Sequence, residues 1–217
     1  MAQFAVMGLG RFGSAASQEL IKLGHSVLGV DMDSKLVTKY ADELTRAVIA
    51  DVTDKQALEE LGVDNYDVVL VGVGSDIQTS LLCVVHLKSL GIDNIWVKAS
   101  SHAQHLILNR LGVARIIHPE EEMGVRTAQV LSYPMVNDYI SLGNGEFIVE
   151  IRVSERLDGM PISKVFGTRA NAPQVLMVKH RSKSAMHPSP EYILHQHDIL
   201  VVFGTLESLR AMAPRLA

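Results

Sequence analysis

Residues 3–132 alternate between two patterns of apolar and polar positions. Short apolar runs, which are typical of buried strands, alternate with segments whose apolar positions have a helical period. The expected strands cover 3–8, 25–33, 46–51, 66–74, 94–100 and 114–119, and the expected helices cover 14–24, 34–44, 54–62, 76–91, 101–112 and 121–133. This alternation predicts an α/β fold, a Rossmann-like doubly wound parallel sheet with helices on both faces.

The pattern changes near residue 134. Proline, asparagine and glycine gather in 134–145, and these residues are typical of turns and linkers. Apolar runs at 146–153, 174–180 and 197–204 then predict strands, and 205–214 predicts a short helix. We therefore expect a Rossmann nucleotide-binding lobe over 1–133, a linker over 134–145 and a small C-terminal α+β lobe over 146–217.

A glycine-rich turn follows the first expected strand. Gly8, Gly10 and Gly13, in the stretch FAVMGLGRFG, have the spacing G-x-G-x-x-G and lie just before the first expected helix. A phosphate beside the backbone needs exposed N–H donors and no obstructing side chain, which such a turn offers. Asp31 ends the second expected strand, where a carboxylate can accept hydrogen bonds from ribose hydroxyls. Together these features predict a nucleotide site that disfavours a ribose 2′-phosphate.

Two residues inside the turn are further binding candidates. Arg11 is either a solvated surface charge or a guanidinium that holds an additional phosphate by bidentate contacts. Phe12, in the same turn, is the other candidate. If Arg11 binds a third phosphate, the ligand is a nucleoside triphosphate.

Further candidate binding residues lie at or just after the ends of the later expected strands. Asp51 follows the third expected strand and either borders an adenine pocket or caps the next helix. Gly74 and Ser75 end the fourth, at the rim where ligands of such folds gather. Glu120 follows the sixth. Acidic residues there commonly complement the helix dipole, but this carboxylate is also a candidate metal ligand for a cation that bridges phosphates.

Composition narrows the class of protein. The chain has 20 Lys and Arg against 24 Asp and Glu, a net charge of −4, which disfavours a nucleic-acid partner. A single cysteine, Cys83, excludes an intramolecular disulfide framework and fits a reducing compartment. No signal peptide is evident, and no apolar stretch is long enough to span a membrane. A membrane partner remains compatible with these features.

The sequence favours a sensor over an enzyme. It contains no C-x-x-C, H-E-x-x-H, G-x-S-x-G or P-loop motif, and its second lobe offers no evident proton donor. The pairs His102–His105 and His195–His197 lack a third ligand nearby, which is more typical of solvated side chains than of a metal site. The alternatives left open are an NAD(H)-binding redox sensor and a small NAD-dependent oxidoreductase.

Two expected helices carry more apolar surface than one sheet face requires. In 76–91 and 101–112, apolar residues cover more than one side of the helix. Burial within the monomer is one explanation, and a second partner surface is the other. We expect a subunit interface here.

The turn FAVMGLGRFG, Asp31, the stretches NIWVKA and RIIHPEEEMG, and the β-rich C-terminal lobe together resemble the RCK family, the regulators of potassium conductance. The resemblance covers essentially the whole chain. It implies a non-enzymatic regulatory subunit that binds ATP or ADP, and often NAD(H), in one cleft. It also implies homodimers that assemble into an octameric ring, docked on a KtrB-like membrane potassium-translocating subunit. The protein would then be cytoplasmic, peripheral to the cytoplasmic face of the membrane.

The resemblance also implies roles for individual residues. Gly8, Gly10 and Gly13 would cradle the phosphates, Asp31 would hold the ribose and Asp51 would border the adenine. Arg11 would reach the γ-phosphate, on the nucleotide of the neighbouring subunit, and Glu120 would attend a divalent cation near that phosphate. ATP would favour an active transporter and ADP an inactive one.

Overall fold

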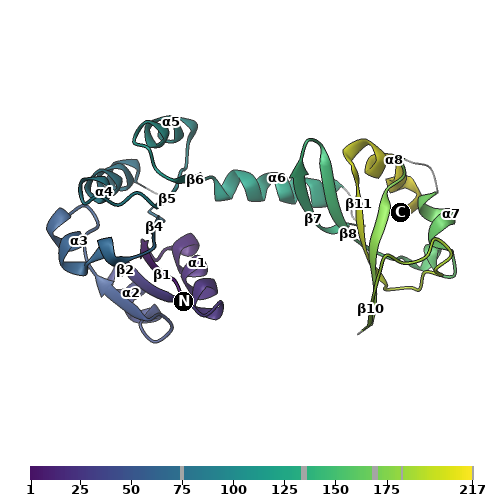
Figure 1. Ribbon diagram of the computed structural model, residues 1–217, viewed down its shortest axis with the longest axis horizontal. Helices are drawn as coiled ribbons and strands as arrows, with labels where there is room; N and C mark the ends of the chain where they lie inside the picture. The colour runs from purple at the N-terminus through teal and green to yellow at the C-terminus, as the bar shows by residue number, and fades with distance from the viewer. Residues whose placement is uncertain (74–75, 133–135, 168–170, 182, 217) are drawn as a thin grey trace. The chain divides into compact units, whose positions relative to one another are not determined.

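The computed structural model describes residues 1–73, 76–132, 136–167, 171–181 and 183–216 (Figure 1). The chain divides into two compact units, Met1–Glu121 and Glu122–Ala217. The division falls at the start of the last helix that we placed in the first lobe, and not at the expected boundary after residue 133. The second unit therefore includes most of that helix.

Unit 1 is built on a six-stranded parallel sheet in the order β3-β2-β1-β4-β5-β6. Its strands are β1 (Gln3–Met7), β2 (Ser26–Asp31), β3 (Arg46–Ile49), β4 (Val68–Val71), β5 (Ile95–Lys98) and β6 (Arg115–Ile117). The predicted doubly wound α/β fold is confirmed. The strand order reverses between β1 and β4, and in such sheets a crevice opens beyond the carboxyl ends of the strands at that point.

Helices cover both faces of this sheet. They are α1 (Arg11–Lys22), α2 (Ser34–Tyr40), α3 (Lys55–Leu61), α4 (Ile77–Ser89) and α5 (His102–Arg110), with a 3-10 turn at Val63–Asn65. Side chains alternate along β1, so Val6 packs with residues of α1 and α2, whereas Ala5 and Met7 pack with residues of α3, α4 and α5. Each face thus has its own apolar core.

Helix starts in unit 1 are marked by short polar side chains. Four helices are capped by a side chain that accepts a backbone N–H from the first turn: Asp33 for α2, Asp54 for α3, Asp76 for α4 and Ser101 for α5. Helix α1 differs, because Gly10 precedes it and no side chain caps it. It begins at Arg11, three residues before the start that the sequence pattern indicated.

Unit 2 contains a five-stranded antiparallel sheet in the order β10-β9-β11-β8-β7. Its strands are β7 (Val136–Gly143), β8 (Glu146–Arg152), β9 (Gln174–His180), β10 (Lys183–Met186) and β11 (Ile199–Thr205). Its helices are α7 (Ile162–Phe166) and α8 (Leu206–Leu216), with a 3-10 turn at Glu155–Leu157. Helix α6 (Pro119–Ser132) precedes this sheet and begins in unit 1.

The segment that we expected as a linker, 134–145, differs from that prediction over residues 136–143. These residues form β7, which pairs antiparallel with β8. Asn144 and Gly145 join the two strands, both with positive φ, 51° and 76°, as a tight two-residue hairpin requires. The sequence pattern therefore marks a hairpin turn, not a connection between lobes.

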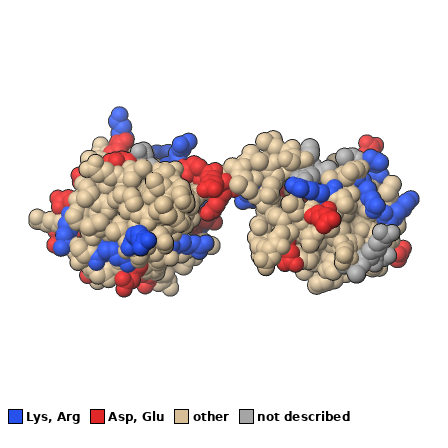
Figure 2. Space-filling model, turned by 90° about the horizontal axis from the view of Figure 1, so that it is seen from above, with Lys and Arg blue, Asp and Glu red and all other residues tan. Residues whose placement is uncertain are grey.

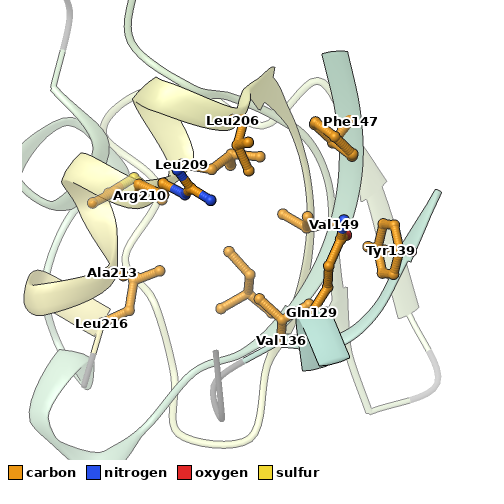
Figure 3. Close-up of a pocket in the computed structure, with 12 residues that line it drawn as sticks. Gln129, Val136, Tyr139, Phe147, Val149, Leu206, Leu209, Arg210, Ala213 and Leu216 are labelled. Carbon is orange, nitrogen blue, oxygen red and sulfur yellow. The ribbon is translucent and has the colours of Figure 1, made fainter. Parts of the chain in front are cut away.

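Unit 2 has a compact apolar core of its own. Val149, Ile151, Leu200 and Val202 of β8 and β11 pack with Met212 and Leu216 of α8. A small cavity of about 40 Å³ remains between α8 and the strands, with almost wholly apolar walls (Figure 3). Its volume is close to that of one or two water molecules.

Candidate functional site

The glycine-rich turn joins β1 to α1 at the carboxyl edge of the sheet. Gly8 has a φ of 99°, in the left-handed region, and its N–H donates to the carbonyl oxygen of Val30 at 2.7 Å. At Gly13, a Cβ atom would lie 1.9 Å from the carbonyl oxygen of Gly8. No side chain fits in that gap, so the first turn of α1 can pack this closely on β1 only with glycine at position 13.

Gly10 lies where the turn enters α1. A Cβ atom there would meet no other atom within 4 Å, so the space beside this residue is open. Its carbonyl oxygen accepts the N–H and the hydroxyl of Ser14, at 2.9 and 2.8 Å. Because no side chain caps α1, the N–H groups of its first turn are left for a ligand, and the helix dipole favours an anion there.

Asp31 fastens the turn to the end of β2. One carboxylate oxygen accepts the N–H of Leu9 at 2.7 Å, and the other accepts the N–H of Asp33 at 2.8 Å. Each carboxylate oxygen can accept more than one hydrogen bond, so the group has capacity left for ribose hydroxyls. Asp31 therefore orders the turn, and it lies where the predicted ribose would bind.

Asp51 follows β3 at the same edge. Its Oδ1 accepts the N–H and the hydroxyl of Thr53, at 2.8 and 2.7 Å, while Asp54 caps α3. The alternative that Asp51 is itself the helix cap is therefore wrong. Asp51 also lies near Cys83 of α4, whose thiol pKa is raised to about 12, chiefly by burial and further by the Asp51 charge. Such a thiol stays protonated at neutral pH and is unreactive.

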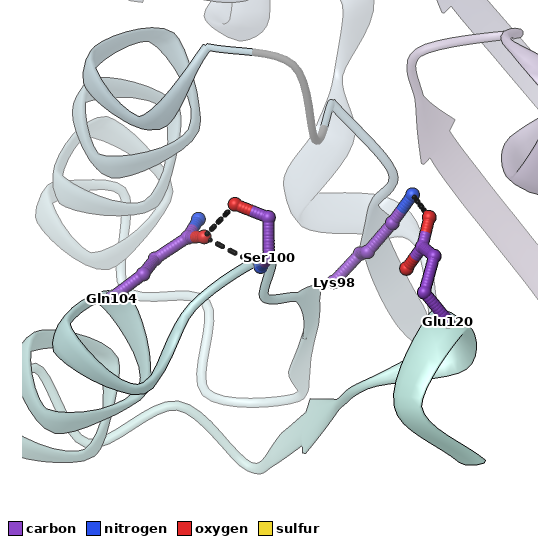
Figure 4. A network of polar contacts seen from close by, with 4 residues as sticks. All are labelled: Lys98, Ser100, Gln104 and Glu120. Carbon is purple, nitrogen blue, oxygen red and sulfur yellow. Dashed lines mark hydrogen bonds and ion pairs between the residues drawn. The ribbon is translucent and has the colours of Figure 1, made fainter. Parts of the chain in front are cut away.

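A group of charged residues lies beside the turn. The Lys98 ammonium, at the end of β5, forms an ion pair with Glu120 at 2.5 Å (Figure 4). It also lies 5.8 Å from the centre of the Phe12 ring. The hydrogen bond from Lys98 lowers the pKa of Glu120, and the charges of Lys98 and Arg11 lower it further. Arg11, Phe12, Lys98 and Glu120 thus share one neighbourhood at the edge of the sheet.

A buried polar network holds the residues that follow β5 at the carboxyl edge of the sheet. Gln104 of α5 is 1% exposed, and its Oε1 accepts the N–H and the hydroxyl of Ser100 at 2.8 and 3.1 Å (Figure 4). Its Nε2 donates to the hydroxyl of Ser80 in α4 at 3.2 Å. Gln104 thereby fixes the residues that follow β5 relative to two helices.

The structure brings most of the predicted residues to one edge of the sheet. Lys98 and Gln104 were not predicted. Lys98 could have been predicted from the sequence, because it ends a strand at the carboxyl edge of the sheet, where ligands bind in such folds. Nothing in the sequence indicates that Gln104 is buried. Gly74 and Ser75 lie outside the described residues. Within the described part of the chain, no group of three or more His, Cys, Asp or Glu is arranged to hold a metal, and Glu120 is paired with Lys98.

The surface shows no single dominant charge on the face in view. Lys and Arg are interspersed with Asp and Glu (Figure 2). This mixture agrees with the slightly acidic composition and not with a basic nucleic-acid footprint. None of the helices among the described residues has the length and apolar character needed to cross a bilayer.

Comparison with known proteins gives consistent results. The model of the TrkA-N domain matches residues 4–119. The chain is 41% identical over 208 residues to Ktr system potassium uptake protein A of Bacillus subtilis, covering 96% of this chain and 94% of that protein.

Solved structures share the fold. The crystal structure of the GsuK RCK domain superposes with a TM-score of 0.64 at 15% identity, over 100% of this chain and 48% of that one. The GsuK channel bound to NAD superposes with a TM-score of 0.56 at 19% identity, over 100% of this chain and 38% of that one. This chain thus spans about half or less of those chains.

Proposed function

The chain belongs to the TrkA-N family, and from this premise we propose that it is a nucleotide-sensing regulatory subunit of a potassium-uptake system. The relative that is 41% identical over nearly its whole length is a Ktr potassium uptake protein, which supports a role in potassium transport. The regulated partner would be a membrane potassium-translocating subunit, and the chain would bind it from the cytoplasmic side. No chemical reaction is required for this role.

One observation carries the nucleotide part of the proposal. The uncapped first turn of α1 faces open space at Gly10, and Asp31 is fastened to the same turn. A diphosphate would accept the free N–H groups, and ribose hydroxyls would donate to Asp31. Asp51 lies farther along the same edge, where an adenine would extend. We infer an adenine nucleotide, ATP or ADP, as the ligand.

Arg11 would read the third phosphate. It is an exposed side chain on the first turn of α1, and its charge acts on Glu120. ATP and ADP differ by one phosphoryl group, so a ligand-driven switch needs a contact that only ATP makes in one of the two states. A guanidinium suits that contact, and a divalent cation held by Glu120 would offset the added charge.

Assembly supplies the second part of the proposal. Helices α4 and α5 expose apolar side chains that the monomer does not cover: Ile77, Leu82, Val85, Leu106 and Ile107. We propose that these side chains form one apolar patch, which a second copy of the chain covers in a homodimer. We propose that dimers associate further into an octameric ring, through which a change at the nucleotide site reaches the membrane subunit.

The experiment is small-angle X-ray scattering on nucleotide-stripped protein with ATP or ADP, for the parent chain and for Arg11→Ala. The parent should show two distinct profiles of one oligomer. Arg11→Ala should bind both nucleotides and give a single profile. Lys22→Ala is the matched control, because Lys22 lies at the far end of α1 in an exposed ion pair with Glu19. If Arg11→Ala still distinguishes ATP from ADP, the role given to Arg11 is wrong.

A second candidate is a sensor of the NADH/NAD ratio. The likeness to the GsuK channel bound to NAD and the position of Asp31 favour it, because both are compatible with a dinucleotide. This alternative gives Arg11 no special part. Binding of NADH at least tenfold tighter than ATP by the parent chain would support it over the adenine-nucleotide switch.

A further inference from the structure

Two histidines that are 13 residues apart in the sequence meet on unit 1. Nδ1 of His105, in α5, lies 2.9 Å from Nε2 of His118, which directly precedes α6. Both side chains are half-buried, and their ring centroids are 5.1 Å apart. They line a surface hollow of about 520 Å³ together with Ser100, Ser101, Glu120 and Glu121. The sequence pairs considered above did not include His118.

Two arrangements are open to the facing nitrogens of His105 and His118. A neutral imidazole has one N–H and one lone pair, so two facing nitrogens either share one proton in a hydrogen bond or both direct lone pairs to a third atom. The second arrangement needs only the tautomer of His105 that is protonated at Nε2 and the tautomer of His118 that is protonated at Nδ1. Both tautomers are neutral, so no proton has to leave the pair.

We propose that His105 and His118 bind a first-row transition-metal ion of the Zn²⁺ class, through Nδ1 and Nε2 respectively. Two imidazole nitrogens on a tetrahedral Zn²⁺, each at about 2.0–2.1 Å, lie roughly 3.3 Å apart. The observed 2.9 Å therefore has to widen by a few tenths of an ångström, and both rings have to turn so that their lone pairs converge on the ion. Imidazole donors favour Zn²⁺, Cu²⁺ and Ni²⁺ over Mg²⁺ and Ca²⁺, which prefer oxygen ligands.

The ligand count determines the kind of site. Since the described residues hold no group of three or more His, Cys, Asp or Glu suited to a metal, the pair is a two-imidazole site whose other positions are taken by water. Glu121 lines the same hollow, and its negative charge favours a cation there. Such a site binds more weakly than a structural zinc with four protein ligands, and exchanges its ion more readily. It is also separate in chemistry from the oxygen-bound cation proposed at Glu120.

His102 provides a matched control. Its ring stacks on that of His105 with centroids 6.1 Å apart and planes within 6°, and it lines the same hollow. It nevertheless does not complete a three-residue group with the pair. A variant at His102 keeps the local surface and changes the same residue type, so it separates metal binding by the pair from nonspecific attraction to histidines.

The test is titration of the full-length, nucleotide-free protein with Zn²⁺ in competition with a chromophoric chelator. The parent should bind one Zn²⁺ per chain, and excess Mg²⁺ should not displace it. His105→Gln and His118→Gln should each weaken binding by at least about tenfold, whereas His102→Gln should change it less than about twofold. Glutamine can retain hydrogen bonds at these half-buried positions, and circular dichroism would confirm that each variant is folded.

A second measurement needs no variant. In Cu²⁺-loaded parent protein, electron paramagnetic resonance should show coupling to two imidazole nitrogens. Absence of stoichiometric Zn²⁺ binding, unchanged binding by both His105→Gln and His118→Gln, or a Cu²⁺ spectrum without nitrogen coupling would overturn the proposal. In the first case the pair is only a hydrogen bond, and in the second the ion lies elsewhere, for example near His180 and His195. Each of these results is distinct from a failure of nucleotide binding.

Discussion

The two units use glycine for different purposes. In unit 1, a Cβ at Gly13 would lie 1.9 Å from a backbone oxygen, and a Cβ at Gly29 would lie 2.6 Å from Leu44. In unit 2, Gly143 and Gly145 have positive φ, yet a Cβ at either would meet nothing within 4 Å. Glycine thus permits close packing around the nucleotide site of unit 1 and tight turning at the β7–β8 hairpin of unit 2. Glycine substitutions in the two units should therefore differ in how much stability they cost and in whether they weaken ligand binding.

Gly13→Ala should give the largest effect. Its Cβ would overlap rigid backbone, so α1 or the turn must move, and we expect a loss of about 3 kcal/mol or more in the free energy of unfolding. Unfolding in urea, followed by the fluorescence of Trp96, measures this directly, because Trp96 is the single tryptophan and lies in unit 1. A loss under about 1 kcal/mol would mean that the turn is more compliant than its geometry indicates.

Gln104→Leu should come next. It leaves the N–H of Ser100 and the hydroxyl of Ser80 without their partner, and an unsatisfied buried polar group costs about 1–3 kcal/mol. We expect Gln104→Leu to lower the free energy of unfolding by about 2 kcal/mol in the same urea experiment. Gln56→Leu, at an exposed position of α3 in the same unit, is the control and should stay within about 0.5 kcal/mol. Equal effects of the two variants would contradict the role given to the buried network.

Gly143→Ala should cost less and act locally. No atom obstructs the new Cβ, and only the φ of 88° is unfavourable, at about 1–2 kcal/mol. Hydrogen exchange should accelerate at the amides of β7 and β8 alone. The urea transition of Trp96 and the affinity for nucleotide should both stay as in the parent. Weakened nucleotide binding would show that the contrast between the units does not hold.

The smallest effect concerns the Lys98–Glu120 pair. Lys98 lowers the pKa of Glu120 in the folded protein, so the pair stabilises the fold above the ordinary glutamate pKa. That contribution is lost as the pH falls through the lowered folded pKa. Because the Glu120 side chain is 67% exposed, we expect the pair to contribute less than about 1 kcal/mol to the free energy of unfolding. Urea unfolding between pH 3 and 7 should show a shallower decline in Lys98→Met, and an identical decline would argue against the pair.

The sequence predicted unit 1 well because its signals are local and repeated. Each strand is short and apolar, the helix after the first strand has a clear apolar period, and the turn at Gly8, Gly10 and Gly13 has a fixed spacing. Because β2 pairs with β1, Asp31 at the end of β2 lies beside that turn.

Other features depend on the folded chain and could not be read from its sequence. Gln104 looks like any polar helix residue until burial is known, and His118 meets His105 only through the packing of β6 beside α5. The hairpin of unit 2 is a different case, because Asn144–Gly145 between two apolar runs is a sequence signal for a two-residue turn. Our linker prediction for 134–145 did not use that signal.

The proposed function depends most on an adenine nucleotide lying over the first turn of α1. Calorimetric titration of nucleotide-stripped protein with ADP tests this directly, in the parent and in Gly10→Ala, whose Cβ meets no protein atom within 4 Å and would enter the proposed phosphate site. The parent should bind one ADP per chain, and Gly10→Ala should fold normally and bind at least about tenfold more weakly. Equal affinities, or no saturable binding to the parent, would contradict the account.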